Sequence, residues 1–411
     1  MDYKKLLFDS LLSEKYYTNI DLRMNRKYGF LLSNQQLDEY LKYKEENNDL
    51  EFAETKIELP LKSWNSKKIF FYFSNELISV IKDYSLYLKD DYVQNKSIYV
   101  IRNITEVAIG MLYSELEGTL KIEGVNTTRR QIEHIITNNI NENINDKIIN
   151  NMNRGFNFII KDPEFNKDNL KKLYDILSDG CLTPENEIKD LYYRYDKVYI
   201  SNHSGCPADR IDECMNSLFD FVNNSALKDD RLKILGPYIA HYYLLYIHPY
   251  FDYNGRTARM VQLWLLIKNG FYDIFLSEAI NDNKNAYYTA LDDSRNSHND
   301  LTYFLTYLFR LCNKYIVIHK NLEKIKSDIE STGESISDRE LHYLKRIIIN
   351  KKIGWFNFKR FNEFQDIDIT KAGALKILNK FEGMGLLISK INKSNEKVFI
   401  FNEDILEYEL K

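Results

Sequence analysis

The sequence predicts a mainly helical protein of several domains with a few short strands. Only 15 glycines and 6 prolines occur in 411 residues, so long segments run without the turns that a strand-rich fold needs. At roughly 100–200 residues per domain, this length corresponds to two or three domains. A change in charge after residue 338 indicates that the last domain differs from the rest.

The overall composition excludes several classes of protein. The 56 Lys and Arg against 60 Asp and Glu argue against a globally basic nucleic-acid coat and against a disordered acidic tail. Four scattered cysteines without a CxxC pair do not make a disulfide framework or a zinc knuckle. The N-terminus lacks the apolar segment of a secretory signal, and no run of about 18 apolar residues is present. We therefore expect a cytoplasmic protein without a membrane span.

Helical periodicity organises the chain up to about residue 322. Residues 1–103 form a predicted N-terminal helical domain, with apolar residues at helical spacing in NELISVIKDYSLYL. Thr105 is a candidate N-cap for the next helix, and Thr127 or Thr128 is a candidate N-cap for the helix after it. Tyr195–Ile200 alternates like a short strand and is followed by a turn-rich segment. Further helices are predicted at 167–179, 232–247, 257–268, 286–294 and 301–322.

The charged, serine-bearing segment 324–337 is predicted to be a linker. Residues 338–400 beyond it hold 13 Lys and Arg against 7 Asp and Glu, a net charge of +6. Two predicted helices, 339–350 and 370–383, precede two short strands, 386–391 and 397–401. This order resembles a winged helix, so residues 338–411 are predicted to form a winged-helix-like α+β module. Winged helices bind DNA or dock proteins, and the sequence leaves both open.

The stretch 248–259, HPYFDYNGRTAR, carries groups suited to binding a polyphosphate. An Asp-x-Asn-Gly loop leads into a predicted helix, whose N-terminus offers free N–H groups and a partial positive charge. Gly255 lets the backbone approach a ligand closely. Arg256 and Arg259 lie on one face of that helix and can both bind phosphate oxygens.

Two further side chains of the same stretch bear on catalysis. Asp252 is a hard oxygen ligand suited to Mg²⁺ beside a phosphate. His248, at the end of the preceding helix, has the chemistry of a general base. Taken singly, such residues most simply cap a helix or form surface ion pairs. The complete order of twelve residues instead favours attack on a nucleotide phosphate.

This stretch resembles the Fic-domain signature, H-P-F-x-[DE]-G-N-G-R-x-x-R. Members of that family share an all-α core with a small β-hairpin flap, and most transfer AMP from Mg·ATP to a Ser, Thr or Tyr hydroxyl of a target protein. The resemblance implies a Fic catalytic domain at 104–323 and a protein adenylyltransferase, which is a nucleotidyltransferase. By position it implies His248 as base, Asp252 as Mg²⁺ ligand, Asn254, Gly255 and Arg256 around the α- and β-phosphates, Arg259 at the γ-phosphate, Tyr288 at the adenine pocket, and Val198, Tyr199 and Ile200 in the flap that aligns the target.

Residues 119–124, TLKIEG, resemble the inhibitory motif [ST]-x-x-x-E-[GN] of the same family. The resemblance implies that Glu123, with Thr119 at the start of the motif, pairs with Arg259 and blocks productive seating of the γ-phosphate. A carboxylate on that arginine competes directly with a phosphate oxygen. In some relatives the same Glu positions a water that removes AMP again, so Glu123 has two candidate roles.

Two positions depart from the signature. Tyr250 replaces Phe, a mild change, whereas Tyr253 replaces the first Gly of G-N-G and puts a bulky side chain in the phosphate loop. Family members without that Gly include phosphocholine transferases and a kinase-like branch. Two alternatives therefore stay open: an enzyme that transfers another group, such as UMP or phosphocholine, or a nucleotide-responsive DNA-binding regulator with a weakened site. The target protein and the oligomeric state, a homodimer included, are also open.

Overall fold

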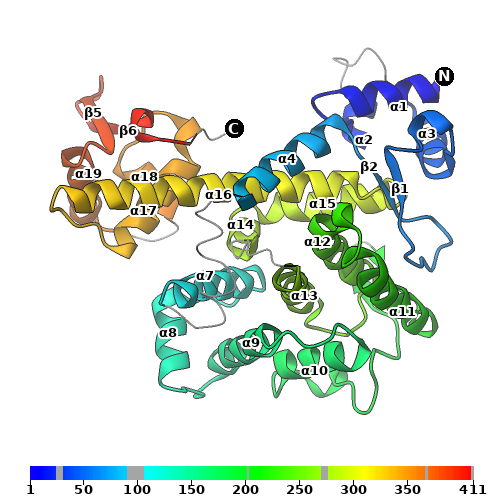
Figure 1. The fold of residues 1–411 in the computed structure, drawn as a ribbon. Coiled ribbons are helices and arrows are strands. Elements are labelled where there is room, and N and C mark those ends of the chain that lie inside the picture. Colours follow the sequence, from blue (N-terminus) through cyan, green and yellow to red (C-terminus); the bar gives the residue numbers. More distant parts are fainter. Residues whose placement is uncertain (25–30, 90–105, 201–202, 270–275, 366–368, 409–411) are drawn as a thin grey trace. The chain divides into compact units, whose positions relative to one another are not determined.

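The computed structural model describes residues 1–24, 31–89, 106–200, 203–269, 276–365 and 369–408 (Figure 1). This part of the chain is mostly helical and contains three two-stranded antiparallel sheets, which confirms the predicted fold class. It folds into two compact units, Met1–Asn313 and Lys314–Lys411. The predicted domain boundary at 103/104 and the candidate cap Thr105 lie outside the described residues. No helix in the described ranges combines the length and apolar character needed to cross a bilayer.

The first unit contains the following elements in chain order: α1 (Tyr3–Leu12), α2 (Asn19–Met24), α3 (Asn34–Glu46), β1 (Lys56–Glu58), β2 (Phe70–Tyr72), α4 (Asn75–Lys89), α7 (Glu106–Ile122), α8 (Arg129–Thr137), α9 (Ile144–Ile160), α10 (Lys167–Ser178), β3 (Tyr199–Ile200), β4 (His203–Ser204), α11 (Ile211–Phe221), α12 (Asp230–Ile247), α13 (Asn254–Lys268), α14 (Leu276–Asp282) and α15 (Lys284–Asn296). Helix α16 (Thr302–Ser331) begins in this unit and continues into the second.

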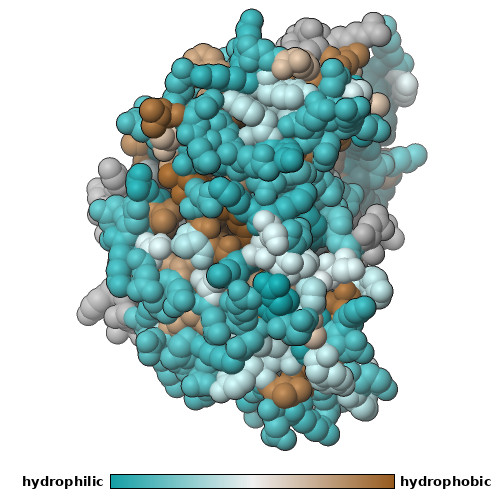
Figure 2. Space-filling view, turned by 90° about the vertical axis from the view of Figure 1, so that its right-hand side faces the viewer, coloured by the Kyte–Doolittle hydropathy of each residue, from teal (hydrophilic) through white to brown (hydrophobic). Residues whose placement is uncertain are grey.

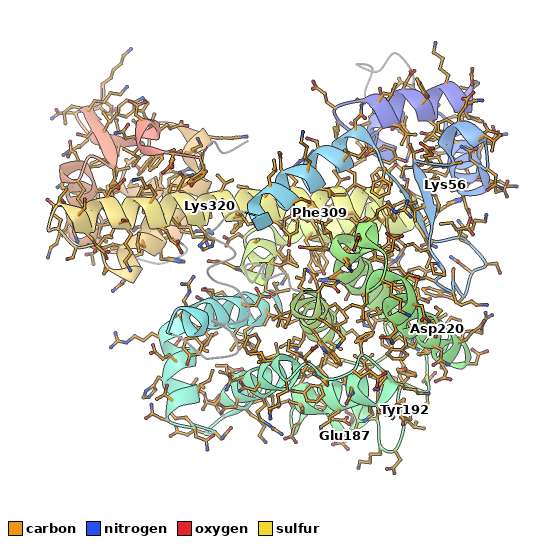
Figure 3. All side chains as sticks on the ribbon, viewed as in Figure 1. Lys56, Glu187, Tyr192, Asp220, Phe309 and Lys320 are labelled. Carbon is orange, nitrogen blue, oxygen red and sulfur yellow. The ribbon has the colours of Figure 1, made fainter. Side chains whose placement is uncertain are left out.

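Helices α12 and α13 pack against each other in the core of the first unit, and apolar side chains make up most of their buried residues. The buried polar side chains of α13 lie mainly in its first two turns. Trp264 of α13 meets Phe158 and Phe165 edge-on, at ring-centroid distances of 6.0 and 5.1 Å. On the other side, Tyr238 of α12 lies 4.7 Å from Phe309, which is labelled in Figure 3. This packing fixes the two helices between which the signature loop runs.

The N-terminal helices are joined to the segment between α15 and α16 by a buried ion pair. Lys44 of α3 lies 2.6 Å from the Asp300 carboxylate, and neither side chain reaches solvent. The rings of Tyr16 and Tyr303 lie 4.8 and 5.0 Å from the Lys44 ammonium. Because a buried cation needs such partners, this contact fixes the segment between α15 and α16.

Helix α7 is held close to α14 by one glycine and one carboxylate. A Cβ on Gly118 would lie 2.4 Å from the Glu278 backbone nitrogen, so only glycine allows this approach. Glu115, one turn earlier, accepts a 2.9 Å hydrogen bond from the Ser277 N–H at the start of α14. These contacts fix the C-terminal end of α7, which carries the TLKIEG segment.

In the described part of the second unit, two of the helices and the hairpin occur in the order that the sequence predicts, and a further helix, α18, lies between the two helices where only a short segment was expected. Its elements after α16 are α17 (Asp338–Ile349), α18 (Phe358–Gln365), α19 (Lys371–Gly383), β5 (Leu387–Ile391) and β6 (Lys397–Phe401). Strands β5 and β6 pair antiparallel, and Phe356 adds a bridge to Phe399. Buried residues of α17, α19 and the hairpin form one apolar core, which contains Leu344, Phe381 and Phe399.

The structure differs from the prediction in the segment 324–337. Residues up to Ser331 continue α16, and only the residues after it are irregular before α17. Ile325 and Ile329, four residues apart on one helix face, are buried in the core of the second unit. The helix ends near Gly333, which has a φ of +82°. Charge and serine content alone suggested a linker, but the apolar pair makes this segment part of a helix.

Hydrophilic side chains cover most of the face shown in Figure 2, and apolar side chains gather in small groups among them. This distribution agrees with a charged fraction of 28%.

Candidate active site

The loop between α12 and α13 has a fixed shape. His248 caps the end of α12 in the left-handed conformation (φ 55°, ψ 63°), and its N–H donates to the Leu244 carbonyl at 2.8 Å. The Asn254 side chain closes the loop, because its amide accepts from the Tyr250 N–H at 3.0 Å and donates to the Tyr250 carbonyl at 2.8 Å. These two bonds close the loop that leads from His248 to the first turn of α13.

Tyr253, the main departure from the signature, is accommodated in an unexpected way. Its φ is +64°, a conformation that favours glycine. Its ring is buried and lies under the Arg256 guanidinium, with 3.4 Å between the guanidinium carbon and the ring centroid. The positive φ that makes Tyr unfavourable at this position is therefore present, as the sequence comparison with the signature suggested. In return, the ring stacks against the guanidinium of Arg256.

The N-terminus of α13 presents several groups that suit an anion. The Thr257 N–H already bonds the Tyr253 carbonyl at 2.9 Å, whereas the preceding N–H groups of the first turn have no partner within the helix. The Arg256 Nε is buried without a hydrogen-bond partner. A phosphate placed here would meet backbone donors, an arginine and the positive end of the helix dipole.

Asp252 is the carboxylate closest to this anion site in sequence. Its side chain is 48% exposed and lies 3.6 Å from Arg256. Its Oδ1 accepts a 2.5 Å hydrogen bond from the Tyr253 N–H. No group of three or more His, Cys, Asp or Glu that could enclose a metal occurs in the described ranges. A lone, accessible carboxylate suits a metal ion that takes its other ligands from water and phosphate, as Mg²⁺ does.

Arg259 is bonded to both predicted members of the inhibitory segment. Its Nε donates to the Thr119 hydroxyl at 2.8 Å, and its Nη2 lies 2.5 Å from Glu123 Oε1. The arginine is fully buried, whereas the Glu123 side chain is 27% exposed. Burial alone would raise the pKa of the Glu123 carboxyl, but Arg259 outweighs burial and lowers that pKa. The glutamate is therefore charged when it occupies Arg259.

Two further residues, Gly255 and Lys284, lie close to Glu123 or to the end of α7 that precedes it. A Cβ on Gly255 would lie 2.6 Å from Glu123 Oε1 and 3.2 Å from Arg259, so glycine is required for this approach. Lys284, at the start of α15, donates a short hydrogen bond to the Ile122 carbonyl at the end of α7. The C-terminal end of α7 thus lies directly against the signature helix.

The environment of His248 favours its neutral form. Burial, followed by the positive charge of Arg194, lowers the pKa of His248 to about 4. The imidazole is therefore a free base at neutral pH.

The predicted flap is a short hairpin. Tyr199 and Ile200 form β3 and pair with β4, and the Val198 carbonyl extends the pairing by accepting from the Gly205 N–H at 3.0 Å. The tip, 201–202, lies outside the described residues. His203 of β4 lies 3.2 Å from Asp292 of α15. The flap is therefore tied to α15 by a contact that spans 89 residues of sequence.

Tyr288 lies on α15, and its side chain is largely exposed. The adjacent Tyr287 is buried, and its hydroxyl lies 2.7 Å from Nε2 of His241. The other nitrogen of His241 is hydrogen-bonded to Gln262 of α13. The Tyr287–His241–Gln262 chain thereby fixes α15 to the signature helix and holds Tyr288 at the edge of the site.

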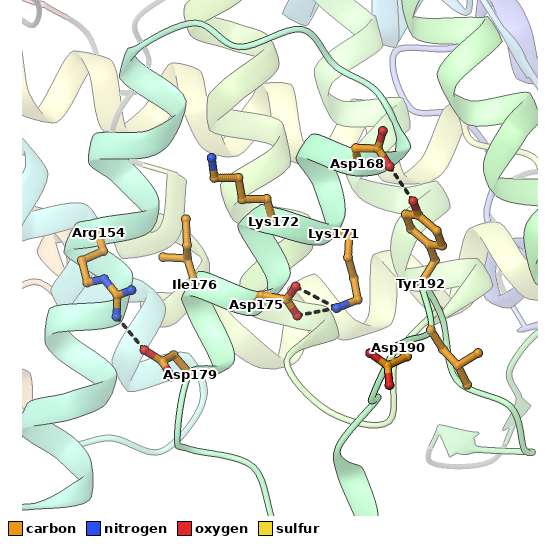
Figure 4. A pocket seen from close by; sticks show the side chains of 10 residues that line it. Arg154, Asp168, Lys171, Lys172, Asp175, Ile176, Asp179, Asp190 and Tyr192 are labelled. Atoms are coloured by element: carbon orange, nitrogen blue, oxygen red, sulfur yellow. Dashed lines mark hydrogen bonds and ion pairs between the residues drawn. The ribbon is translucent and has the colours of Figure 1, made fainter.

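A separate groove of about 630 Å³ lies along α10 (Figure 4). Its charges pair with one another: Lys171 bonds Asp175 at 2.6 Å, and Arg154 bonds Asp179 at 2.8 Å. None of the predicted site residues lines this groove. This groove is therefore separate from the candidate active site at α13.

Sequence reasoning missed Arg194, a buried guanidinium next to His248. Its partners are backbone carbonyls, which leave no pattern in the sequence. The only available signal was an arginine at the start of a predicted strand, and that signal is not specific.

Comparisons with known proteins identify a family and several relatives. Residues 164–266 match the Fic/DOC family. Protein adenylyltransferase Fic of Nematostella vectensis is 30% identical over 128 residues, covering 30% of this chain and 28% of that protein. Protein adenylyltransferase fic-1 of Caenorhabditis elegans is 28% identical over 144 residues, covering 34% of this chain and 27% of that protein. The chain therefore matches less than a third of the length of these relatives. A Fic family protein from Desulfovibrio desulfuricans G20 superposes with a TM-score of 0.49 at 14% identity, covering 81% of this chain and 97% of that one.

Proposed function

The chain contains a Fic/DOC-family domain at residues 164–266, and from this premise we propose that it transfers AMP from ATP to a Ser, Thr or Tyr hydroxyl of a target protein. The observation that carries the proposal is one juxtaposition. His248, neutral at pH 7, ends α12 and is followed by a short loop that leads into α13, the helix that carries Arg256 and Arg259. Glu123, which is hydrogen-bonded to Arg259, also acts on His248 by its charge. A base beside a polyphosphate site is what attack by a hydroxyl on a nucleotide requires.

ATP would bind along the first turn of α13. The free N–H groups of Asn254, Gly255 and Arg256 suit the α- and β-phosphates, and the Arg256 guanidinium adds charge there. Arg259, one turn later, suits the γ-phosphate once Glu123 leaves it. Tyr288 would face the adenine.

Asp252 would hold Mg²⁺. Its exposed carboxylate fits an ion that keeps several waters and binds substrate phosphates. When bound, the ion would neutralise charge on the triphosphate and on the departing pyrophosphate.

His248 would accept the proton of the target hydroxyl as its oxygen attacks the α-phosphorus. The new P–O bond joins AMP to the target, the bond from the α-phosphorus to the bridging oxygen breaks, and pyrophosphate leaves. A pKa near 4 keeps His248 unprotonated before ATP binds. The anionic triphosphate beside the imidazole would then raise that pKa and strengthen the base.

Strand β3 would align the target segment. Tyr199 is exposed, and the edge of the two-stranded hairpin is available for strand addition by an extended peptide. Main-chain pairing of this kind places a hydroxyl side chain by register, so Val198, Tyr199 and Ile200 would position the target and His248 would act on it.

Glu123 would inhibit transfer, because it occupies the donors of Arg259 that the γ-phosphate needs. Removal of AMP from the target, with Glu123 orienting a water, remains a second role of the same carboxylate in this proposal.

The test is intact-mass spectrometry of the Glu123→Gly protein incubated with Mg²⁺ and either ATP, CTP, GTP or UTP, together with a panel of candidate targets. We expect the mass of one nucleoside monophosphate to be added with ATP, and the choice of nucleotide separates AMP from UMP transfer. The matched control carries Glu123→Gly and His248→Ala and should bind ATP without transferring AMP. Equal transfer by this control would rule out His248 as the base.

A further inference from the structure

Arg194 is a buried cation whose side chain is hydrogen-bonded to backbone oxygens. Its side chain is 2% exposed. Its Nε donates to the His248 carbonyl at 2.8 Å, its Nη1 donates to the Asp196 carbonyl at 2.5 Å, and its Nη2 donates to the Cys206 carbonyl. In the described part of the chain, no carboxylate lies within ion-pair distance of it. A guanidinium in this position retains its full positive charge in a poorly solvated place.

The three carbonyls belong to residues that flank the flap or act in the proposed reaction. Asp196 precedes β3, Cys206 follows β4, and His248 is the proposed base. The backbone adds two bonds to the same cluster, from Arg194 N–H to the Pro249 carbonyl at 2.9 Å and from Cys206 N–H to the Ile247 carbonyl at 3.1 Å. One side chain therefore joins both ends of the flap to the histidine.

The neighbouring glycine supports the same arrangement. A Cβ on Gly205 would lie 2.9 Å from the Arg194 Nη2 and 3.5 Å from the His248 Cβ. The guanidinium thus fills the space between the flap and the base. Its bond to the His248 carbonyl also stabilises a left-handed backbone that a histidine adopts at a cost.

We infer that Arg194 is a positioning residue, which holds the His248 backbone in register with the flap and places its positive charge next to His248. The expected effect of Arg194 on AMP transfer rests on the proposed function. Its expected effect on the His248 pKa does not.

The charges that face His248 come from three elements. Arg194 and Arg295 of α15 disfavour the imidazolium, and Glu123 after α7 favours it. Burial is the largest cause of the low pKa of His248, and Arg194 is the next. Removing the Arg194 charge should therefore raise this pKa more than removing the Arg295 charge.

The experiment measures the His248 pKa by NMR in the full-length protein, with its signal assigned by its loss in His248→Ala. The variants are Arg194→Gln, Arg194→Lys and Arg295→Gln, and Arg210→Gln is the control because Arg210 is a surface residue paired with Glu213 at 2.9 Å. We expect Arg194→Gln to raise the pKa from about 4 toward its ordinary value and Arg194→Lys to keep it low. An unchanged pKa in folded Arg194→Gln would overturn the inference.

Transfer assays of the same variants in the Glu123→Gly protein separate positioning from charge. Arg194→Lys keeps the charge but loses the planar fork, so kcat should fall at least tenfold while the KM for ATP stays within about twofold. If Arg194→Gln does not fold, the Arg194→Lys variant is the test. A kcat equal to that of the Glu123→Gly parent would overturn the inference, and a lower kcat with an unchanged KM for ATP would support it. If the Glu123→Gly parent transfers nothing, the proposed function fails, and the His248 pKa still tests Arg194.

Discussion

Glu123 Oε1 lies 2.5 Å from the Arg259 Nη2, although 136 residues separate them in sequence. Arg259 is therefore paired with an anion from its own chain. Its Nε also donates a hydrogen bond to Thr119, on the helix that ends just before Glu123.

Replacing Glu123 by Gln should raise the rate of transfer by roughly tenfold or more, because a charge-assisted hydrogen bond of about 1.5–3 kcal/mol no longer competes with the γ-phosphate. Initial rates of AMP incorporation measure this. Glu117→Gln is the matched control, since Glu117 lies on the same helix and pairs with Lys121 and Arg129. Equal rates in Glu123→Gln and wild type would refute the inhibitory role.

Tyr253 should be replaceable by Phe but not by Gly. Phe keeps the ring under Arg256, so the KM for ATP should stay within about twofold. Gly relieves a positive φ but removes that ring, so the KM should rise about threefold to thirtyfold, as expected for a cation–π contact of roughly 0.5–2 kcal/mol. Steady-state kinetics of both variants in the Glu123→Gly protein provide the measurement. A lower KM in Tyr253→Gly would mean that the ring crowds the phosphates.

The free energy of unfolding should fall as the pH falls from about 6.5 to 4. Burial lowers the pKa of His241 to about 3, and burial with Arg194 lowers that of His248 to about 4. The unfolded chain binds protons at these histidines over a range where the folded protein does not, so each contributes a slope of up to about 1.4 kcal/mol per pH unit. Urea unfolding at several pH values measures it. His241→Gln should reduce the slope, and an unchanged slope would exclude His241 as a source.

Lys44→Met should destabilise the protein by about 3–5 kcal/mol, because it leaves the buried Asp300 carboxylate without its cation. Lys42→Met is the control on the same helix, where the exposed pair with Glu46 at 3.9 Å should contribute less than about 1 kcal/mol. Thermal and urea unfolding compare the two variants. Similar stability of both variants would show that the buried pair contributes little.

The sequence predicts the elements that carry a local pattern. The C-terminal strands occur at 387–391 and 397–401, close to the predicted ranges. Helix α13 ends at Lys268 as predicted but begins at Asn254, so that the Asn-Gly predicted as a loop lies in its first turn. Contacts between distant residues have no such pattern. Lys44 and Asp300 show no local sign of their pairing, and Arg194 binds carbonyls, which every residue has. Elements that have a local sequence pattern can be predicted from the sequence. Burial and the partners of distant residues can be seen only in the structure.

The position of Glu123 has a consequence for how the protein would respond to its surroundings. Because the carboxylate and Arg259 belong to one chain, the local concentration of the inhibitor is fixed by the fold and does not change on dilution. Gly118 and Glu115 hold α7 against α14, and beyond the end of this helix the Glu123 side chain is 27% exposed. With this arrangement, displacement of the Glu123 side chain from Arg259 would activate the protein. Activation would not depend on the concentration of the protein in the cell.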